Sequence, residues 1–168
     1  MAIKNPKDLF VLLLSSVRNA TERSASAYDE LGEAAQHPEI KEALEARNFI
    51  SKQNLDKIDQ VFKIIGEKPT PVAERIHDVI VEDFRKELSD IQSPEAKRLY
   101  VLAKINQLIH ARIAQYIALI AASDATGHFG AGVLLETCLA DHLAFAERTK
   151  RLLHHVVEAR MAARAAGA

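Results

Sequence analysis

The sequence predicts an all-α protein whose four long helices form an up-down bundle, with an additional short crossover helix. Apolar residues recur at steps of three and four along most of the 168 residues, which is the period of an amphipathic helix. Strong helix formers such as Ala, Leu, Glu and Lys are abundant, whereas only six Gly and five Pro occur. Most of the Pro and Gly residues stand between the periodic stretches, where helices begin and end.

The first long helix is predicted to begin at Pro6, because Asn5 is typical of an N-cap and proline is favoured at the first helical position. Its apolar stripe continues to Ala35. The second long helix begins at Pro38, after a short turn, and Gly66 is its predicted C-terminal cap. A turn this short makes the two helices antiparallel neighbours.

A shorter crossover helix is predicted after the extended Pro69-Thr70-Pro71 segment. One side of it carries the apolar residues that we expect to be buried: Val72, Ile76, Val79, Ile80, Phe84, Leu88 and Ile91. The third long helix begins at Ser93-Pro94 and is broken by three glycines between residues 127 and 132. The fourth follows them, and residues 162–168 form a tail that we expect to fray.

The crossover helix bridges two antiparallel pairs of long helices. One long crossover is the connectivity of ferritin-like bundles, so we expect a ferritin-like fold. The length of the chain fits a single domain over residues 1–168, with its core in residues 6–157.

Composition and charge exclude several classes of partner. The formal net charge is −1, with 22 basic and 23 acidic residues spread along the chain, so we expect neither nucleic acid nor a membrane as a partner. Cys138 is the only cysteine, which excludes an internal disulfide and suits a reducing compartment. The apolar run Leu9–Leu14 is too short for a signal peptide, and no run approaches the roughly 18 residues of a membrane span. We therefore expect a cytoplasmic protein.

A ferritin-like di-metal site needs inward-facing carboxylates and histidines, with Glu-x-x-His as the recurring spacing. That spacing occurs once, as Glu74 and His77, at the start of the crossover helix and beside its apolar side. We interpret it as surface decoration. No long helix carries the motif, which argues against an intact di-iron centre.

Polar residues interrupt the apolar stripes near the middle of the long helices. They are Thr21, Arg47, Ser51, Asn106, His110, Asp141 and His142. One interpretation is a buried hydrogen-bonded network, because polar groups in a core need partners. The other is a degenerate metal site in which His110 and His142 are nitrogen ligands and Asp141 is the carboxylate, holding one zinc or iron ion. Arg47 is a cation that would oppose such a metal.

Three segments carry a family resemblance: Asp8–Ser15, Ile58–Phe62 and Leu134–Leu139. On these residues the chain resembles the YciE/YciF-like family of ferritin-like bacterial proteins over roughly residues 6–157. The resemblance implies a ferritin-like fold, a bacterial cytoplasmic setting, dimerisation and an association with stress responses.

The resemblance also places the family's metal ligands on this sequence, where most are replaced. The glutamate of the first helix falls on Thr21, and the Glu-x-x-His pair of the second falls on Phe49 and Lys52. The third helix keeps only His110, and an acidic run on the fourth becomes Ala140-Asp141-His142. The resemblance therefore does not carry iron chemistry onto these residues.

Our first hypothesis is a non-enzymatic, stress-associated structural or interaction protein that works as a homodimer and holds no cofactor. Dimerisation is suggested by apolar residues that lie off the main stripes: Leu9, Leu12, Leu108, Leu119 and Leu153. The alternative is a metal-dependent oxidase, peroxidase or iron-storage protein that uses His110, Asp141, His142 and Glu22. A third hypothesis is an anion-binding or regulatory module at the basic end of the last helix, against which the net charge argues.

Overall fold

Residues 3–73 and 75–166 are described by the computed structural model, and over these ranges the chain forms five helices and no strand. They are α1 (Pro6–Ala35), α2 (Pro38–Ile65), α3 (Arg75–Leu88), α4 (Pro94–Ala125) and α5 (Phe129–Ala166). The all-helical class predicted from the sequence is confirmed.

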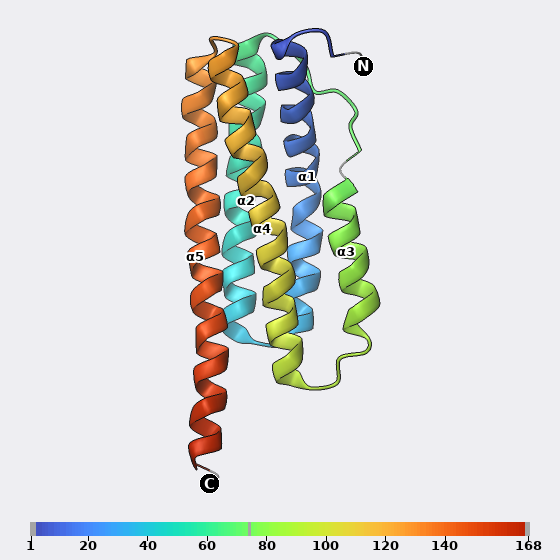
Figure 1. Ribbon diagram of the computed structural model, residues 1–168, viewed down its shortest axis with the longest axis vertical. Helices are drawn as coiled ribbons and strands as arrows, with labels where there is room; N and C mark the ends of the chain where they lie inside the picture. The colour runs from blue at the N-terminus through green and yellow to red at the C-terminus, as the bar shows by residue number, and fades with distance from the viewer. Residues whose placement is uncertain (1–2, 74, 167–168) are drawn as a thin grey trace.

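The four long helices lie side by side, and α3 lies outside them (Figure 1). Helix α1 packs against α2 and α4, and α5 packs against the same two helices, whereas α3 packs mainly against α4. Helices α2 and α4 run in the same direction, because the connection that contains α3 returns the chain to the end where α2 began (Figure 1).

The helix ends follow local signals. Asn5 caps α1 by accepting a hydrogen bond from the backbone N–H of Asp8 at 2.9 Å, and Gly66 ends α2 in the left-handed region with φ 69°. The expected break at the glycines is confined to Gly127, with φ 73°, while Gly130 and Gly132 lie within α5. A Cβ on Gly132 would lie 2.8 Å from Ser123 Oγ, so this glycine allows α4 and α5 to approach closely.

Helix α3 differs from its prediction in the side that it buries. Its buried residues are His77, Val81 and Phe84, whereas Ile76 and Val79 are 57% and 53% exposed. The expectation that His77 is a surface residue is therefore wrong, and Glu74 lies outside the described residues. A short helix on the outside of a bundle makes contact along a narrow strip only, so its apolar spacing alone does not determine which strip is buried.

The apolar core consists of two clusters. The lower core, at the end of the bundle where α1 joins α2, includes Tyr28, Leu31, Ile40, Leu44, Leu102, Ile105 and Phe145. The upper core, at the other end, includes Phe10, Leu14, Ile58, Phe62, Leu119, Leu135 and Cys138. Buried polar residues occupy the helix segments between them, and we call these the polar layer: Thr21, Ser24, Arg47, Ser51, Asn54, Arg112 and His142.

Helix α5 extends past the ends of the other helices at its C-terminus (Figure 1). The tail that we expected to fray is helical as far as Ala166. Among the described helices, only α5 is long and apolar enough to cross a membrane, with a mean hydropathy of 1.3 over 18 residues. Of that 18-residue window, 33% is buried in the bundle. Core helices of bundles can be as long and as apolar as this, so one such helix does not indicate a membrane span.

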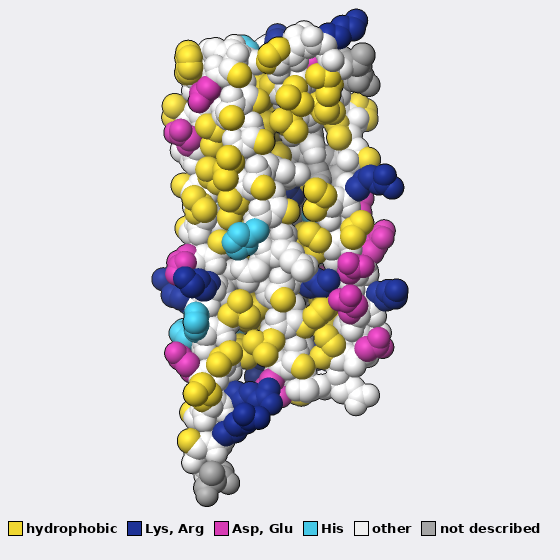
Figure 2. All heavy atoms as spheres, in the orientation of Figure 1, with side chains coloured by type: hydrophobic (Ala, Val, Ile, Leu, Met, Phe, Trp, Pro, Cys, Tyr) yellow, Lys and Arg dark blue, Asp and Glu magenta, His cyan; other side chains and the backbone are white. Residues whose placement is uncertain are grey.

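The exposed apolar residues differ in part from those predicted for a dimer interface. Leu108 and Leu119, predicted to be exposed, are buried at 7% and 0% exposure because both face the core from α4. Other large apolar side chains on α4 and α5 are exposed instead: Ile117, Phe129, Val133, Leu143, Val157 and Met161. Figure 2 shows hydrophobic side chains spread over this α4–α5 face.

Candidate functional site

A contact between Arg47 of α2 and His142 of α5 lies at the centre of the polar layer. Nδ1 of His142 lies 2.7 Å from the carbonyl oxygen of Cys138, which can only accept, so Nδ1 carries the proton and donates it. Nε2 is then an acceptor, and Nη2 of Arg47 donates to it at 2.5 Å. Both ring nitrogens of His142 are therefore engaged in hydrogen bonds.

His142 is neutral in the folded protein. Its side chain is 1% exposed, and burial together with the nearby Arg47 cation lowers the pKa of His142 to about 2. A histidine that accepts a hydrogen bond from a guanidinium has no free nitrogen lone pair for a metal ion. The contact that neutralises His142 thus also occupies the atom that a metal would need.

The rest of the polar layer is rich in hydrogen-bond donors that have no partner. Nε and Nη1 of Arg47, Oγ of Ser51 and Nδ2 of Asn54 are buried without one. The ring of Tyr116 lies 4.9 Å from the ring of His142, which places Tyr116 beside the layer. Unsatisfied buried polar groups are rare in folded proteins, so this group of atoms requires an explanation.

Neither Cys138 nor Tyr116, which lie beside the polar layer, is an activated nucleophile. Cys138 is fully buried on α5, and burial raises the pKa of its thiol to about 11, so the thiol is protonated at neutral pH. Burial also raises the pKa of Tyr116 far above its usual range. Neither side chain supplies the anionic form that nucleophilic catalysis needs.

The three candidate metal ligands predicted from the sequence, His110, Asp141 and His142, have separate surroundings. His110 is exposed, and its Nδ1 lies 2.9 Å from the carbonyl oxygen of Asn106. Asp141 is half-buried and pairs with Lys57, with Oδ2 and Nζ 3.2 Å apart. Over residues 3–73 and 75–166, no three His, Cys, Asp or Glu side chains lie close enough together to hold a metal ion.

The position assigned to the family's Glu-x-x-His pair on α2 is wrong. Phe49 is 65% exposed and Lys52 is also exposed, so neither faces the core. The inward-facing pair at the same spacing is Ser51 and Asn54, at 3% and 0% exposure. Asn54 was missed because it is polar, although steps of four and three from Arg47 lead to it along the buried side of the helix.

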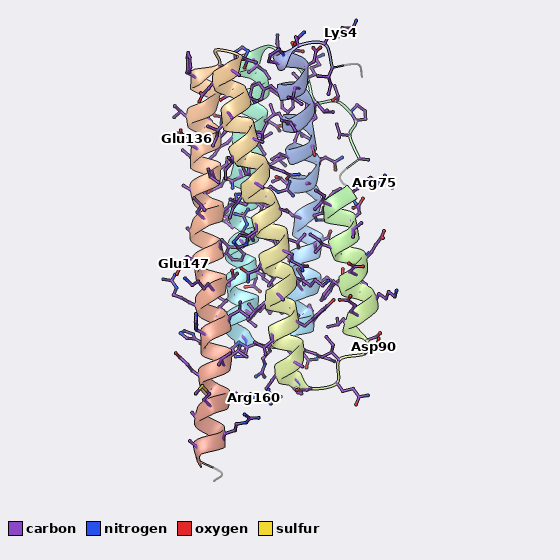
Figure 3. All side chains as sticks on the ribbon, in the orientation of Figure 1. Lys4, Arg75, Asp90, Glu136, Glu147 and Arg160 are labelled. Carbon is purple, nitrogen blue, oxygen red and sulfur yellow. The ribbon has the colours of Figure 1, made fainter. Side chains whose placement is uncertain are left out.

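The carboxylates of the described residues lie outside the centre of the bundle. Glu136 and Glu147 of α5, labelled in Figure 3, point away from the other helices. None of the buried polar side chains in the described part of the chain is an Asp or a Glu. A di-metal centre needs carboxylate oxygens to offset the metal charge in the core, and the polar layer holds arginine in their place.

A hollow of about 270 Å³ lies between α1 and α3, and His77 is among the residues that line it. Both arginines that line it are paired: Arg23 with Asp78, and Arg85 with Glu30 at 2.9 Å. Burial, followed by the nearby Arg112 and Arg23, lowers the pKa of His77. These ion pairs join α3 to α1, beside the buried apolar side chains Val81 and Phe84 of α3.

Over residues 3–73 and 75–166, the fold and the site define an all-helical bundle protein whose central polar layer contains arginine and no buried carboxylate. Residues 5–162 match the family described as "Domain of unknown function (DUF892)", and the chain belongs to this family. The predicted resemblance to YciF-like proteins is confirmed.

Two solved structures share this fold. The E. coli stress protein YciF has a TM-score of 0.88 at 21% identity, covering 93% of this chain and 99% of that one. YcfI from Rhodopseudomonas palustris, described as "a putative structural protein", has a TM-score of 0.84 at 23% identity, covering 88% and 94%. No curated protein sequence matches this chain.

Proposed function

We propose that this protein is a non-enzymatic, stress-associated structural or interaction protein with a ferritin-like bundle, in which the polar layer replaces the di-metal site. The observation that supports this most is the hydrogen bond from Arg47 to Nε2 of His142, because it puts a cation where a metal ion would bind. The protonated thiol of Cys138 adds to the argument, since it leaves the site without a nucleophile.

The ferritin-like assignment rests on topology. Helices α2 and α4 are parallel and joined by the crossover that contains α3, and this connectivity is that of ferritin-like folds (Figure 1). The association with stress and with a structural role comes from the descriptions of the two similar structures, the stress protein YciF and YcfI. We place the protein in the cytoplasm, with neither nucleic acid nor a membrane as its partner.

We further propose that the protein forms a homodimer through the α4–α5 face. Ile117, Phe129, Val133 and Leu143 are each at least half exposed there, and exposed apolar patches of this kind commonly mark interfaces. Light scattering at micromolar concentration should give twice the mass of the chain. An Ile117→Glu, Leu143→Glu variant should then be monomeric, whereas Ile76→Glu on α3, which is equally exposed, should stay dimeric.

The proposed loss of the metal site is tested by metal content. Untagged protein from cells supplemented with iron and zinc should contain far less than one metal ion per chain by elemental mass spectrometry. A His110→Ala, His142→Ala variant should give the same result. Near-stoichiometric metal in the native protein that is lost in this variant would instead establish a metal-dependent oxidase, peroxidase or storage protein.

A further inference from the structure

Arg47 is a buried cation without an anionic partner among the described residues. It is 3% exposed, and its one hydrogen bond goes from Nη2 to His142, which is neutral. Nε and Nη1 have no partner. The ring of Phe145 lies 5.7 Å from the guanidinium carbon, and this cation–π contact offsets only part of the cost of removing the charge from water. The polar layer therefore carries an uncompensated positive charge at Arg47.

A second unpartnered donor lies on the same side of α2 as Arg47. Ser51 follows Arg47 by one helical turn on the buried side of α2, and its Oγ has no partner. A guanidinium and a hydroxyl donor on the same side of a helix are the kind of groups that bind an anion by charge-assisted hydrogen bonds.

Arg47 lines a hollow of about 190 Å³ between α2 and α5. Asp141 and Arg148 also line it, but each has its own partner: Asp141 pairs with Lys57 at 3.2 Å and Arg148 with Glu42 at 3.3 Å. The charge of Arg47 is thus the one that remains to be matched in this hollow.

We infer that a small inorganic monovalent anion, of the size of a halide or nitrate, binds in the polar layer at Nε and Nη1 of Arg47. The hydroxyl of Ser51 is a further donor to it. Water alone would satisfy the donors but would leave the buried positive charge unmatched. A single negative charge matches the single charge of Arg47, and a divalent metal is repelled by it. This inference concerns anions and goes beyond the proposed structural role.

Stability in two salts tests the site. The full chain is unfolded with urea in sodium gluconate, whose anion is too large for the layer, and again with bromide in its place at constant ionic strength. At a bromide concentration ten times its Kd, the ratio of folded to unfolded protein should rise about tenfold. Arg47→Met should lose this response. Arg85→Met, which removes an exposed arginine paired with Glu30, should keep it.

An equal bromide response in the native protein and both variants, or no response in the native protein, would overturn the inference. A direct measurement covers the case in which Arg47→Met does not fold. Crystals of the native protein grown in bromide should show an anomalous peak within hydrogen-bond distance of Nε or Nη1 of Arg47. An ordered water without anomalous signal at that position would show that solvent satisfies these donors and that no anion site exists.

Discussion

The apolar cores and the polar layer are built from the same four helices, yet different kinds of interaction hold them together. In the upper core, Phe10 and Leu14 are fully buried among apolar side chains, and each contact is non-directional. In the polar layer, Arg47 and His142 depend on one directional hydrogen bond and on the tautomer that Cys138 fixes. Losing one partner in the core leaves a cavity, whereas losing one in the layer leaves an unpaired polar group.

The largest effect is expected in the upper core. Replacing Phe10 by Ala should lower the free energy of unfolding by about 3–5 kcal/mol, because it removes a fully buried ring and leaves a cavity. Urea unfolding followed by circular dichroism measures it. Phe49→Ala, at a side chain that is 65% exposed, is the matched control and should change stability by less than about 0.5 kcal/mol.

In the polar layer, the effect of a substitution should depend on whether its hydrogen-bond partner is still present. His142→Leu should cost about 2–3 kcal/mol, because it leaves Nη2 of Arg47 buried without an acceptor. The His142→Leu, Arg47→Met double variant should regain most of the lost free energy of unfolding, since two apolar residues can replace a buried polar pair. The free energies of both single variants and the double variant give the coupling energy. Additive losses would show that the layer behaves like the apolar cores.

Acid should destabilise the layer more than the cores. The pKa of His142 is about 2 when folded and about 6.5 when unfolded, so the unfolded chain binds the extra proton between these values. Stability is thus complete above about pH 6.5 and falls as the pH drops, by about 2 kcal/mol at pH 5. His142→Gln should lose this part of the pH dependence in urea unfolding at pH 5 and 7. An unchanged dependence would show that His142 is not buried in its neutral form.

The smallest effect is expected for an arginine on the surface. Arg18 of α1 bonds to Asp59 of α2 with Nε and Oδ1 2.7 Å apart, but the two side chains are 25% and 40% exposed. Exposed pairs contribute little, so Arg18→Met should cost about 0.2–1 kcal/mol. The same urea experiment, repeated at high salt, should reduce this loss further. A cost as large as that of His142→Leu would remove the distinction between buried and exposed polar contacts.

Local signals in the sequence predicted the helices well. Asn5, Pro6 and Gly66 mark helix ends where the structure has them, because capping bonds join residues close in the chain. The buried polar residues were predicted less completely. Arg47 and His142 were recognised as polar interruptions, but Asn54 was not, and His77 was wrongly expected to be on the surface.

The sequence by itself determined the helical class, the helix boundaries and the residues that form most of the two cores. Periodicity and capping are properties of short stretches, so they are visible without the fold. Only the tertiary structure decided which strip of α3 is buried and that His142 pairs with Arg47, 95 residues away. The physical reason is that a helix's period defines its sides, whereas the partner that each side contacts depends on how the whole chain packs.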